Sequence, residues 1–478
     1  MPAKNAPLRI DLSGFIKKNV TMESLMSGLD LGRQARNLMD SDARKGLMDF
    51  TKLPGDRKLL RMSTDLAKEL SRGVDDLIVC GIGGSALGFL ALVQALLHPF
   101  HNELSRSKRG APRYFLLDNA DAETVSGALD LVNLNRALVV VISKSGSGGE
   151  TIANFFVVLE ALVKKLRGNF KKALQKVVVI TDPEKGPLRK FALEYGVRSL
   201  PVPPNVGGRF SVLAPVGIFP AAMLGIDVAS LMSGAGAMLK RCTEPDMLKN
   251  PAMTLALLLN EHYSQGRKIT VFMPYANALW RTADWFRQLW AESLGKAATR
   301  AGTVVHDGMT PMAALGATDQ HSQVQLYAEG PDDKTYIFLR TASPRKLAIP
   351  KPRFGADAYG FLGGRTLDEL LNIEGDATQA ALAHFGRPTA RIDMPGTTAH
   401  ALGQVLMLLE MTTACVGALW NINTFDQPGV ELGKILTACG MGQKSACEKV
   451  IDVRTGVKAK DIMPRKGKAS GAIRELIF

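Results

Sequence analysis

Two loops in the first half of the chain are rich in glycine, and the second of them is also rich in hydroxyl side chains. The first, residues 81–86, reads GIGGSA and follows the apolar run DLIVC. The second, residues 143–151, reads SKSGSGGET and follows ALVVVI. A helix-like pattern comes after each loop, so free backbone N–H groups and several hydroxyls are expected to meet at a helix N-terminus. All oxygens of a phosphate monoester accept hydrogen bonds, and this composition therefore suits a phosphate site.

The first loop fits the dinucleotide fingerprint G-x-G-x-x-G/A, but the second half of that motif is missing. The motif requires an acidic residue about 20 positions further on, at the end of the next strand. Around position 100 the chain reads HPFHNEL, and the next acid that ends a strand is Asp118. The sequence therefore argues against a nicotinamide or flavin site, and it contains no Walker loop.

A polar turn that caps a helix is the alternative explanation for each loop. One loop by itself leaves the two explanations about equal. Two loops in one domain favour a sugar-phosphate site, with Ser85 on the first and Ser143, Ser145 and Ser147 on the second.

The elements that must position these loops alternate between strand and helix. Short runs rich in Val, Ile and Leu each end in a small or polar residue, namely DLIVCGIGG, PRYFLLDN, ALVVVISKSG and KVVVITDP. Buried parallel strands alternating with helices predict a doubly wound sheet, with ligands beyond the carboxyl ends of the strands. A second set begins near Lys268 with KITVFMPYAN and continues with GTVVHDGM and KTYIFLRTA. We therefore predict an α/β protein with two tandem doubly wound α/β/α domains and mainly parallel sheets.

The chain of 478 residues is 46% hydrophobic, which allows a large core. We predict a helical N-terminal arm at residues 1–55 and a first domain, carrying the phosphate loops, at residues 56–215. The second domain is expected at residues 216–440, with helices over roughly 220–265, and a basic tail at residues 441–478.

Composition narrows the partners and the location. The formal net charge is +14 (59 basic minus 45 acidic), but no nucleic-acid signature of basic residues with interleaved aromatics appears, so we expect no nucleic-acid partner. No apolar stretch is expected to be long enough to cross a membrane, and the start MPAKNAPLRIDLSG lacks the apolar core of a signal peptide. The five cysteines have no metal-ligand spacing and are expected to be reduced thiols. We expect a cytoplasmic protein.

Four further blocks, together with the two loops, resemble the phosphoglucose isomerase family. They are VGGRFSVLAPVG from Val206, RQLWAESLGK from Arg287, TDQHSQVQ from Thr318 and NTFDQPGVELGK from Asn423. All blocks occur in the family's order and span most of the chain. The resemblance implies two sugar isomerase domains, an obligate homodimer, and no metal or organic cofactor. It also implies the reversible isomerisation of D-glucose 6-phosphate and D-fructose 6-phosphate, a step of glycolysis and gluconeogenesis, through ring opening and an enediol intermediate.

Glu292 matches the family's carboxylate base, which moves a proton between C2 and C1. It lies in DWFRQLWAESLGK, a predicted helix that stops near Gly295. Gln288 lies one turn earlier (288 + 4 = 292), so both side chains are expected on one helix face. An exposed glutamate near a helix end is the alternative when the other blocks are ignored.

His321, in DQHSQ, matches the histidine for ring opening, and in the family this histidine reaches the active site from the partner subunit. An imidazole titrates near neutrality, so it can take and return a hydroxyl proton. Lys434 matches the lysine that protonates or orients the ring oxygen, although most lysines are simply solvated. Gln427 precedes Lys434 by seven residues and is expected to share its helix face (427 + 7 = 434).

Arg209 follows two glycines and matches the arginine that stabilises the negative enediol. A guanidinium suits that role because it stays charged. The expected phosphate contacts come from the two loops, through side chains and backbone N–H groups: Gly84, Ser85, Ser143, Lys144, Ser145, Gly146, Ser147 and Gly148. The chain departs from the family at Gly148, where many members carry a hydroxyl, and this predicts weaker phosphate binding or a looser loop.

Three alternatives to this activity remain open at the level of sequence. A non-catalytic sugar-phosphate sensor keeps the serine loops but needs no base, and the matching blocks around Glu292, His321 and Lys434 argue against it. An isomerase that also accepts mannose 6-phosphate differs in pocket shape, which sequence does not report. A sugar-phosphate aminotransferase needs an N-terminal cysteine, and this chain begins Met1-Pro2 with no cysteine before Cys80.

Overall fold

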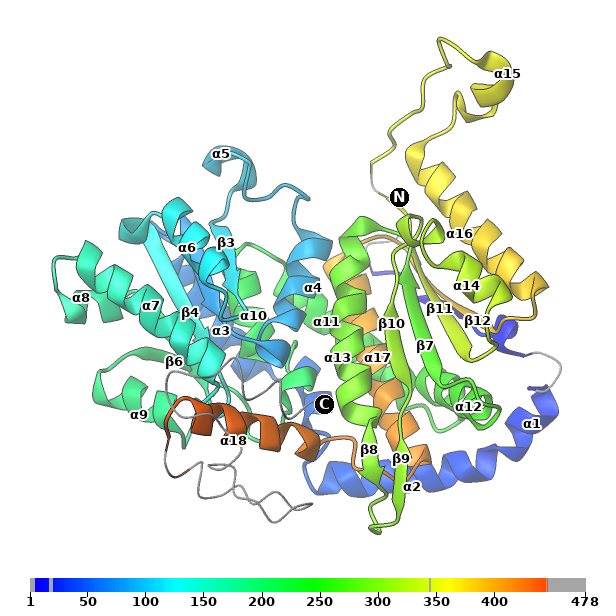
Figure 1. Cartoon of the computed structure of the whole chain (residues 1–478), viewed down its shortest axis with the longest axis horizontal. Helices are drawn as coiled ribbons and strands as arrows, with labels where there is room; N and C mark the ends of the chain where they lie inside the picture. Colours follow the sequence, from blue (N-terminus) through cyan, green and yellow to red (C-terminus); the bar gives the residue numbers. More distant parts are fainter. Residues whose placement is uncertain (1–4, 17–19, 344, 444, 446–478) are drawn as a thin grey trace, which may run out of the picture. The chain divides into compact units, whose positions relative to one another are not determined.

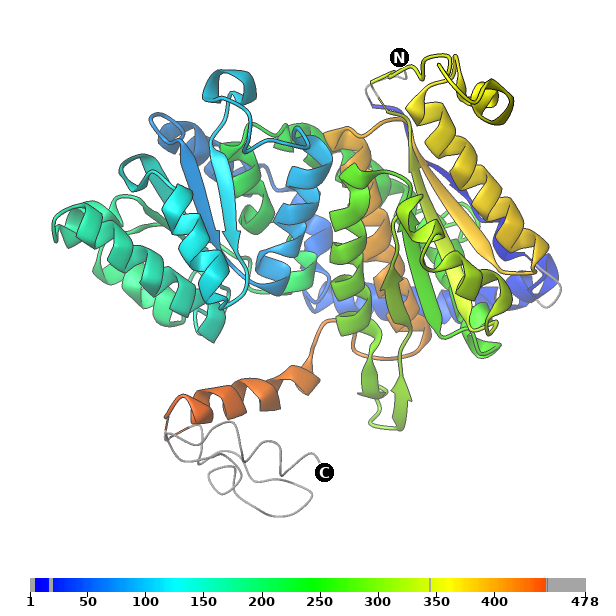
Figure 2. The ribbon, with the colours of Figure 1, turned by 45° about the horizontal axis from the view of Figure 1, so that its top comes forward.

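The structure is a computed structural model that describes residues 5–16, 20–343, 345–443 and 445. Its contacts divide the chain into two compact units, Met1–Thr424 and the residues from Phe425 onward. The first unit contains two five-stranded sheets, which lie side by side with helices α4 (Leu87–Leu96), α13 (Trp280–Leu294) and α17 (Ala399–Leu419) between them (Figures 1 and 2).

The first sheet is fully parallel and has the order β3-β2-β4-β5-β6. Its strands are β2 (Asp76–Cys80), β3 (Arg113–Leu117), β4 (Ala137–Ile142), β5 (Val177–Thr181) and β6 (Arg198–Pro201). The helices of this region are α3 (Arg57–Leu70), α5 (Arg106–Arg109), α6 (Ala122–Leu131), α7 (Gly149–Lys165), α8 (Phe170–Leu174), α9 (Pro187–Glu194) and α10 (Pro215–Met223).

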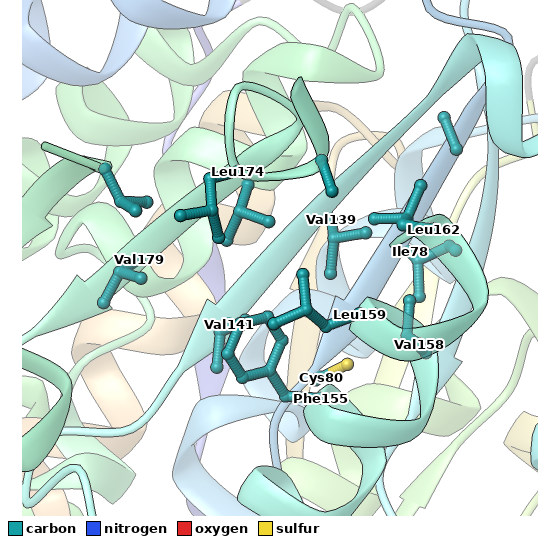
Figure 3. Close-up of a cluster of buried hydrophobic side chains, with 14 of the residues drawn as sticks. Ile78, Cys80, Val139, Val141, Phe155, Val158, Leu159, Leu162, Leu174 and Val179 are labelled. Carbon is teal, nitrogen blue, oxygen red and sulfur yellow. The ribbon is translucent and has the colours of Figure 1, made fainter. Parts of the chain in front are cut away.

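The burial of both sheet faces explains why these strands read as continuous apolar runs. Alternate residues of β2, β4 and β5 point into one cluster with α6, α7 and α9, where Ile78, Val139 and Val141 pack against Phe155 and Leu162 (Figure 3). The residues between them, such as Val79 and Val140, are equally buried and face the opposite side, because successive strand side chains alternate. Helices α3, α4 and α10 pack together on that side.

The second sheet has the order β1-β12-β11-β7-β10 and is parallel except for the antiparallel edge strand β1. Its strands are β1 (Arg9–Asp11), β7 (Ile269–Pro274), β10 (Thr310–Ala313), β11 (Lys334–Thr341) and β12 (Thr389–Met394). The helices around it, besides α13 and α17, are α1 (Met22–Ser27), α2 (Leu29–Arg44), α11 (Val228–Cys242), α12 (Pro251–Ser264), α14 (Val324–Glu329), α15 (Ala356–Tyr359) and α16 (Leu367–His384). Two mainly parallel sheets with helices confirm the predicted fold class, whereas the predicted domain boundaries stay predictions.

Three details differ from the sequence-based expectations. The run GTVVHDGM does not enter the second sheet: β9 (Val304–Asp307) pairs antiparallel with β8 (Lys296–Ala298) in a hairpin that extends past the end of α13 (Figure 2). Thr310–Ala313, the strand after it, takes the place in the sheet. The two-residue alternation and exposure of β9 explain the error, because a hairpin and a half-buried sheet strand share that pattern.

Helix α17 contradicts the expectation that no apolar stretch is long enough for a membrane. Its 21 residues meet that length and composition, but the helix is entirely buried inside the protein, where α2, α11, α12 and α13 pack around it. A helix that is apolar on all sides is explained by such a central position.

The cysteine prediction holds for part of the chain. Cys80, Cys242 and Cys415 are free and buried, and burial raises the pKa of each thiol. Cys439 is disulfide-bonded, so the expectation of a reduced thiol is wrong there. Cys447 lies outside the described residues, as does nearly all of the predicted tail at 441–478.

Candidate active site

Both glycine-rich loops, residues 81–86 and 143–151, lie at the carboxyl edge of the first sheet. The first loop follows β2 and contains the short 3-10 turn Gly83–Ser85, while the second follows β4, the neighbour of β2 in the sheet. Because these strands are parallel, the two loops leave the same edge next to each other. This is the placement that the sequence predicted for a shared ligand site.

The second loop turns tightly around its own serine side chains. Ser143 is buried, and its Oγ accepts the N–H of Gly146 at 3.1 Å. Ser145 Oγ accepts from Ser147 twice, through the backbone N–H at 3.3 Å and the hydroxyl at 3.1 Å. Gly146 has a φ of +68°, and an added Cβ would lie 2.9 Å from the backbone N of Leu188, so a side chain is excluded there.

Helix α7 begins directly after this loop, with Gly148 at its N-cap. The first N–H groups of a helix have no partner within the helix, and its dipole favours negative charge at this end. The predicted phosphate contacts from Ser147 and Gly148 therefore come from the end of a 17-residue helix. Thr151 is buried on the helix, and Glu150 is exposed in its first turn.

Lys144 has a different partner from the one expected. Its ammonium donates to the carbonyl oxygens of Pro204 and, at 2.9 Å, of Val206. Burial lowers the pKa of Lys144, and the nearby Asp182 carboxylate opposes this shift. Lys144 thus ties the second loop to the segment that leads into Arg209, and a direct phosphate contact by its side chain stays a prediction.

The first loop packs directly against the turn that carries Arg209. A Cβ on Gly84 would lie 2.2 Å from the carbonyl carbon of Gly208 and 2.7 Å from the N of Arg209. Gly83 has a φ of +58°, and a Cβ there would lie 3.0 Å from Nε2 of Gln288. The glycines are therefore required for the backbone of this loop to approach both Arg209 and helix α13.

Arg209 is 2% exposed and makes hydrogen bonds through all three of its side-chain nitrogens. Nη1 donates to Oε1 of Glu292 at 3.0 Å, Nε to Oγ of Ser293 at 2.7 Å, and Nη2 to the carbonyl oxygen of Thr424 at 2.6 Å. A buried guanidinium is tolerable only when its charge and its donors are paired in this way.

Glu292 and Gln288 share one face of α13, as their spacing predicted. Gln288 Nε2 donates to Oε2 of Glu292 at 3.0 Å, so each oxygen of the Glu292 carboxylate accepts one hydrogen bond. The two oxygens of a carboxylate offer about four lone pairs, and two therefore remain for a proton from a ligand. The side chain of Glu292 is 23% exposed, whereas Trp285 and Leu289 on the same helix are buried.

His321 is exposed and comes directly after the turn Thr318–Gln320. Its neighbours hold that turn: Asp319 accepts from the backbone N–H of Leu315 and, at 2.7 Å, from the hydroxyl of Ser322. Gln320 donates to Thr378 and to the carbonyl oxygen of Glu374 on α16. No hydrogen bond joins His321 to Arg209 or Glu292 in the described part of the chain.

Lys434 and Gln427 belong to the second unit. Lys434 lies on α18 (Glu431–Gly440), 62% exposed, and its ammonium contacts the Glu431 carboxylate at 2.7 Å. Gln427 lies in non-helical backbone before the short 3-10 turn Pro428–Val430. The expectation that the two side chains share a helix face is therefore wrong, because the helix begins only at Glu431.

Sequence reasoning missed two partners of Arg209, Ser293 and the carbonyl group of Thr424. Ser293 follows Glu292 directly and is 0% exposed, and a polar residue inside the AESLGK block was the available signal. A backbone carbonyl gives no such signal. Among the described residues, no group of three or more His, Cys, Asp or Glu side chains is placed to hold a metal ion.

Two adjacent loops thus leave one edge of the first sheet, and the turn that carries the buried Arg209 and its partner Glu292 packs against the first of them. Residues 62–458 match the model of the family described as phosphoglucose isomerase. The chain is 45% identical to a glucose-6-phosphate isomerase of Rubrobacter xylanophilus, over 82% of this chain and 89% of that protein. It is 43% identical to another from Carboxydothermus hydrogenoformans, over 80% and 82%. The chain belongs to the phosphoglucose isomerase family.

Solved structures share the fold of this chain. A hypothetical protein from Thermus thermophilus is 36% identical and superimposes with a TM-score of 0.82, covering 91% of this chain and all of that one. A glucose-6-phosphate isomerase from Chlamydia trachomatis has the same fold, with a TM-score of 0.69 at 23% identity, over 81% of this chain and 74% of that one.

Proposed function

We propose that this chain interconverts D-glucose 6-phosphate and D-fructose 6-phosphate, with Glu292 as the base that moves the proton between C2 and C1. Membership of the phosphoglucose isomerase family supports the aldose–ketose reaction. The observation that carries the residue assignment is the contact of Glu292 with Arg209 and Gln288, next to the glycine loop.

The proton transfer follows from the groups around Glu292. In the open-chain aldose, a free lone pair of the carboxylate takes the proton from C2, and the electron pair moves onto the carbonyl oxygen at C1 to give an enediolate. A second proton passes from the C2 hydroxyl to the oxygen at C1. The same carboxyl group then returns the first proton to C1, and the electron pair left on the C2 oxygen forms the carbonyl of the ketose. One base serves both steps because the two carbons are neighbours.

Arg209 is proposed to stabilise the charge during this transfer. When Glu292 takes the proton, its negative charge moves to the enediolate oxygens, and the guanidinium 3.0 Å away remains the neighbouring cation. Arginine does not lose its proton near neutral pH, so it cannot protonate the intermediate and end the reaction early. Its burial strengthens the interaction, because little water screens the charges.

The phosphate is proposed to bind the two loops at the sheet edge and fix the sugar over Glu292. Ser85, Ser143, Ser145 and Ser147 are the hydroxyl candidates, and the N-terminus of α7 supplies backbone N–H groups. Gly84 and Gly146 serve the backbone geometry, and the missing hydroxyl at Gly148 weakens the phosphate contact. Holding the sugar by a group remote from the reacting carbons removes much of the entropy cost of the reaction.

Ring opening is proposed to use His321 and Lys434, with Gln427 beside the sugar. His321 exposes its imidazole on the surface, which is the position required for a group that completes the site of a partner subunit in a homodimer. Lys434 is equally accessible on α18. The reaction needs no redox cofactor, because it transfers only protons. We further propose a cytoplasmic protein without a membrane or nucleic-acid partner.

Turnover of glucose 6-phosphate by the purified wild-type chain, with fructose 6-phosphate measured by a coupled assay, tests the function. Glu292→Gln keeps the shape and removes the base, and we expect kcat to fall roughly 100- to 10,000-fold. Glu160→Gln, an exposed glutamate on α7, is the matched control and should leave kcat unchanged. A wild-type chain that binds the sugar phosphate without turnover would instead indicate the sensor, and turnover of mannose 6-phosphate would indicate the broader isomerase.

A further inference from the structure

Ser293 is a buried polar residue whose hydroxyl contacts a different part of the chain. It lies on α13 next to Glu292 and is 0% exposed. Its Oγ accepts a hydrogen bond at 2.7 Å from Nε of Arg209, which is 84 residues away in the sequence. A buried serine in a helix more often bonds back to its own helix, as Ser63 on α3 does with the carbonyl oxygen of Leu59 at 2.9 Å.

The contact fixes the orientation of a planar group. Nε of arginine carries a single hydrogen in the plane of the guanidinium, so the position of its acceptor restricts how that plane can rotate. The other two contacts run from Nη1 to Glu292 and from Nη2 to the carbonyl oxygen of Thr424, so each nitrogen of the planar group has its own acceptor. Three acceptors around one planar group leave it no free rotation.

The helix places two of these acceptors side by side. Consecutive residues on an α-helix point about 100° apart, because one turn takes 3.6 residues. Glu292 therefore points toward the partly exposed side of α13, whereas Ser293 points into the interior. Arg209 spans both directions, with its inner nitrogen on Ser293 and an outer nitrogen on the carboxylate.

We infer that Ser293 is a positioning residue of the isomerase reaction: it holds the guanidinium of Arg209 in the orientation that faces Glu292 during proton transfer. This inference rests on the roles proposed above for Arg209 and Glu292. Charge leaves the carboxylate when it takes the proton, which weakens the Arg209–Glu292 contact at that moment. The Ser293 hydroxyl is neutral and its charge does not change during the transfer, so its contact with the guanidinium persists and keeps the cation in place.

The alternative is that Ser293 only fills space in the helix. The two roles differ in one respect. A residue that acts through Arg209 matters only when Arg209 is present, whereas a packing residue matters regardless of Arg209.

A double-mutant cycle separates the two roles. Ser293→Ala, Arg209→Ala and the double variant are compared with the wild-type chain for kcat and KM with glucose 6-phosphate. We expect Ser293→Ala alone to lower kcat about 10- to 100-fold, as for a misplaced catalytic group, with KM changed less than about threefold. In the Arg209→Ala background the same change should lower kcat less than about threefold. Ser63→Ala, the matched buried helix serine, should leave both constants unchanged.

Two results would overturn the inference: a kcat for Ser293→Ala within about threefold of wild type, or an equal loss with and without Arg209. The wild-type rate in the same assay reports the proposed function separately, so failure of one is distinguishable from failure of the other. Thermal unfolding checks that each variant folds. If Ser293→Ala does not fold, Ser293→Cys carries the same cycle, because sulfur keeps the size and accepts a hydrogen bond only weakly; equal losses in both backgrounds would again contradict the inference.

Discussion

The charge-stabilising part of the proposed active site differs from its ring-opening part in how firmly the chain holds it. Arg209 is buried and hydrogen-bonded on three sides, and Glu292 accepts one bond on each oxygen. His321 and Lys434 are exposed, and among the described residues of the first unit no hydrogen bond joins His321 to that pair.

The difference reflects what each group must do. A group that stabilises developing charge works best when it is already oriented and cannot rearrange, because reorganisation would consume the energy it supplies. A group that shuttles a hydroxyl proton must exchange it with its surroundings, and an exposed imidazole is accessible for that exchange. The firmly held Arg209 and Glu292 therefore suit charge stabilisation, whereas the exposed His321 and Lys434 suit proton exchange during ring opening.

The largest loss of kcat is expected from a change to the buried, charge-stabilising part of the site. Arg209→Ala should lower kcat about 100- to 1,000-fold, by analogy with the loss of an oxyanion donor. Arg287→Ala is the matched control, since this arginine lies on α13 with its side chain 58% exposed, and its kcat should stay within about twofold. Steady-state kinetics measure both. A loss below about tenfold for Arg209→Ala would remove it from the mechanism.

The exposed position of His321 leads to the prediction that each active site combines Glu292 of one subunit with His321 of the other. His321→Ala should lower kcat about 100-fold, less than Glu292→Gln, because the sugar ring also opens unaided in solution. Mixing His321→Ala with Glu292→Gln chains should restore activity, because half of the random dimers then hold one intact site. About a quarter of the wild-type activity per chain is expected for a two-fold dimer. Mixed samples that stay as inactive as the separate variants would show that each chain supplies both residues to its own site.

A change in the second loop is expected to have a smaller effect, and to improve substrate binding rather than impair catalysis. Gly148→Thr adds a hydroxyl at the N-cap of α7, where an added Cβ meets nothing closer than 3.9 Å. We expect KM to fall about three- to tenfold, the net value of one typical hydrogen bond. Gly148→Ala, which adds the Cβ without the hydroxyl, should leave KM unchanged. A KM for the threonine variant that stays the same or rises contradicts the proposed phosphate contact.

The smallest effect concerns the turn before His321. Burial raises the pKa of Asp319, but the hydrogen bonds from Leu315 and Ser322 outweigh it, and the net pKa is lowered. A lowered carboxyl pKa means that its stabilisation is complete above the unfolded value near 3.9 and is lost as the pH falls through the folded value. Asp319→Asn should therefore cost about 1–2 kcal/mol of unfolding free energy at pH 7, and less below about pH 4. Denaturant unfolding at several pH values measures this, and a cost independent of pH would contradict it.

The sequence predicted those features that depend on local patterns. The continuous apolar runs gave the parallel strands, and the four-residue spacing of Gln288 and Glu292 gave their contact. Both follow from the periodicity of a single element. The loops after β2 and β4 were expected at the carboxyl ends of parallel strands, and the two strands are parallel neighbours in the sheet.

The features that sequence missed depend on contacts between distant segments. Arg209 meets Ser293 and the carbonyl group of Thr424 across 84 and 215 residues, and no local pattern encodes such a meeting. The assumed helix from Gln427 to Lys434 failed because the helix begins at Glu431, after a proline-containing turn. The positive charge of Lys144 and its place in the second loop suggested a phosphate contact, yet its ammonium donates to backbone carbonyl oxygens.

The division of labour between the two parts of the site is tested most directly by separating ring opening from proton transfer. Glu292→Gln is incubated with glucose 6-phosphate in deuterated water, and NMR follows deuterium uptake at C2 together with exchange between the two ring anomers. We predict that deuterium uptake falls to the rate without enzyme, while anomer exchange stays faster than without enzyme. Deuterium uptake close to the wild-type rate would contradict the assignment of Glu292 as the base.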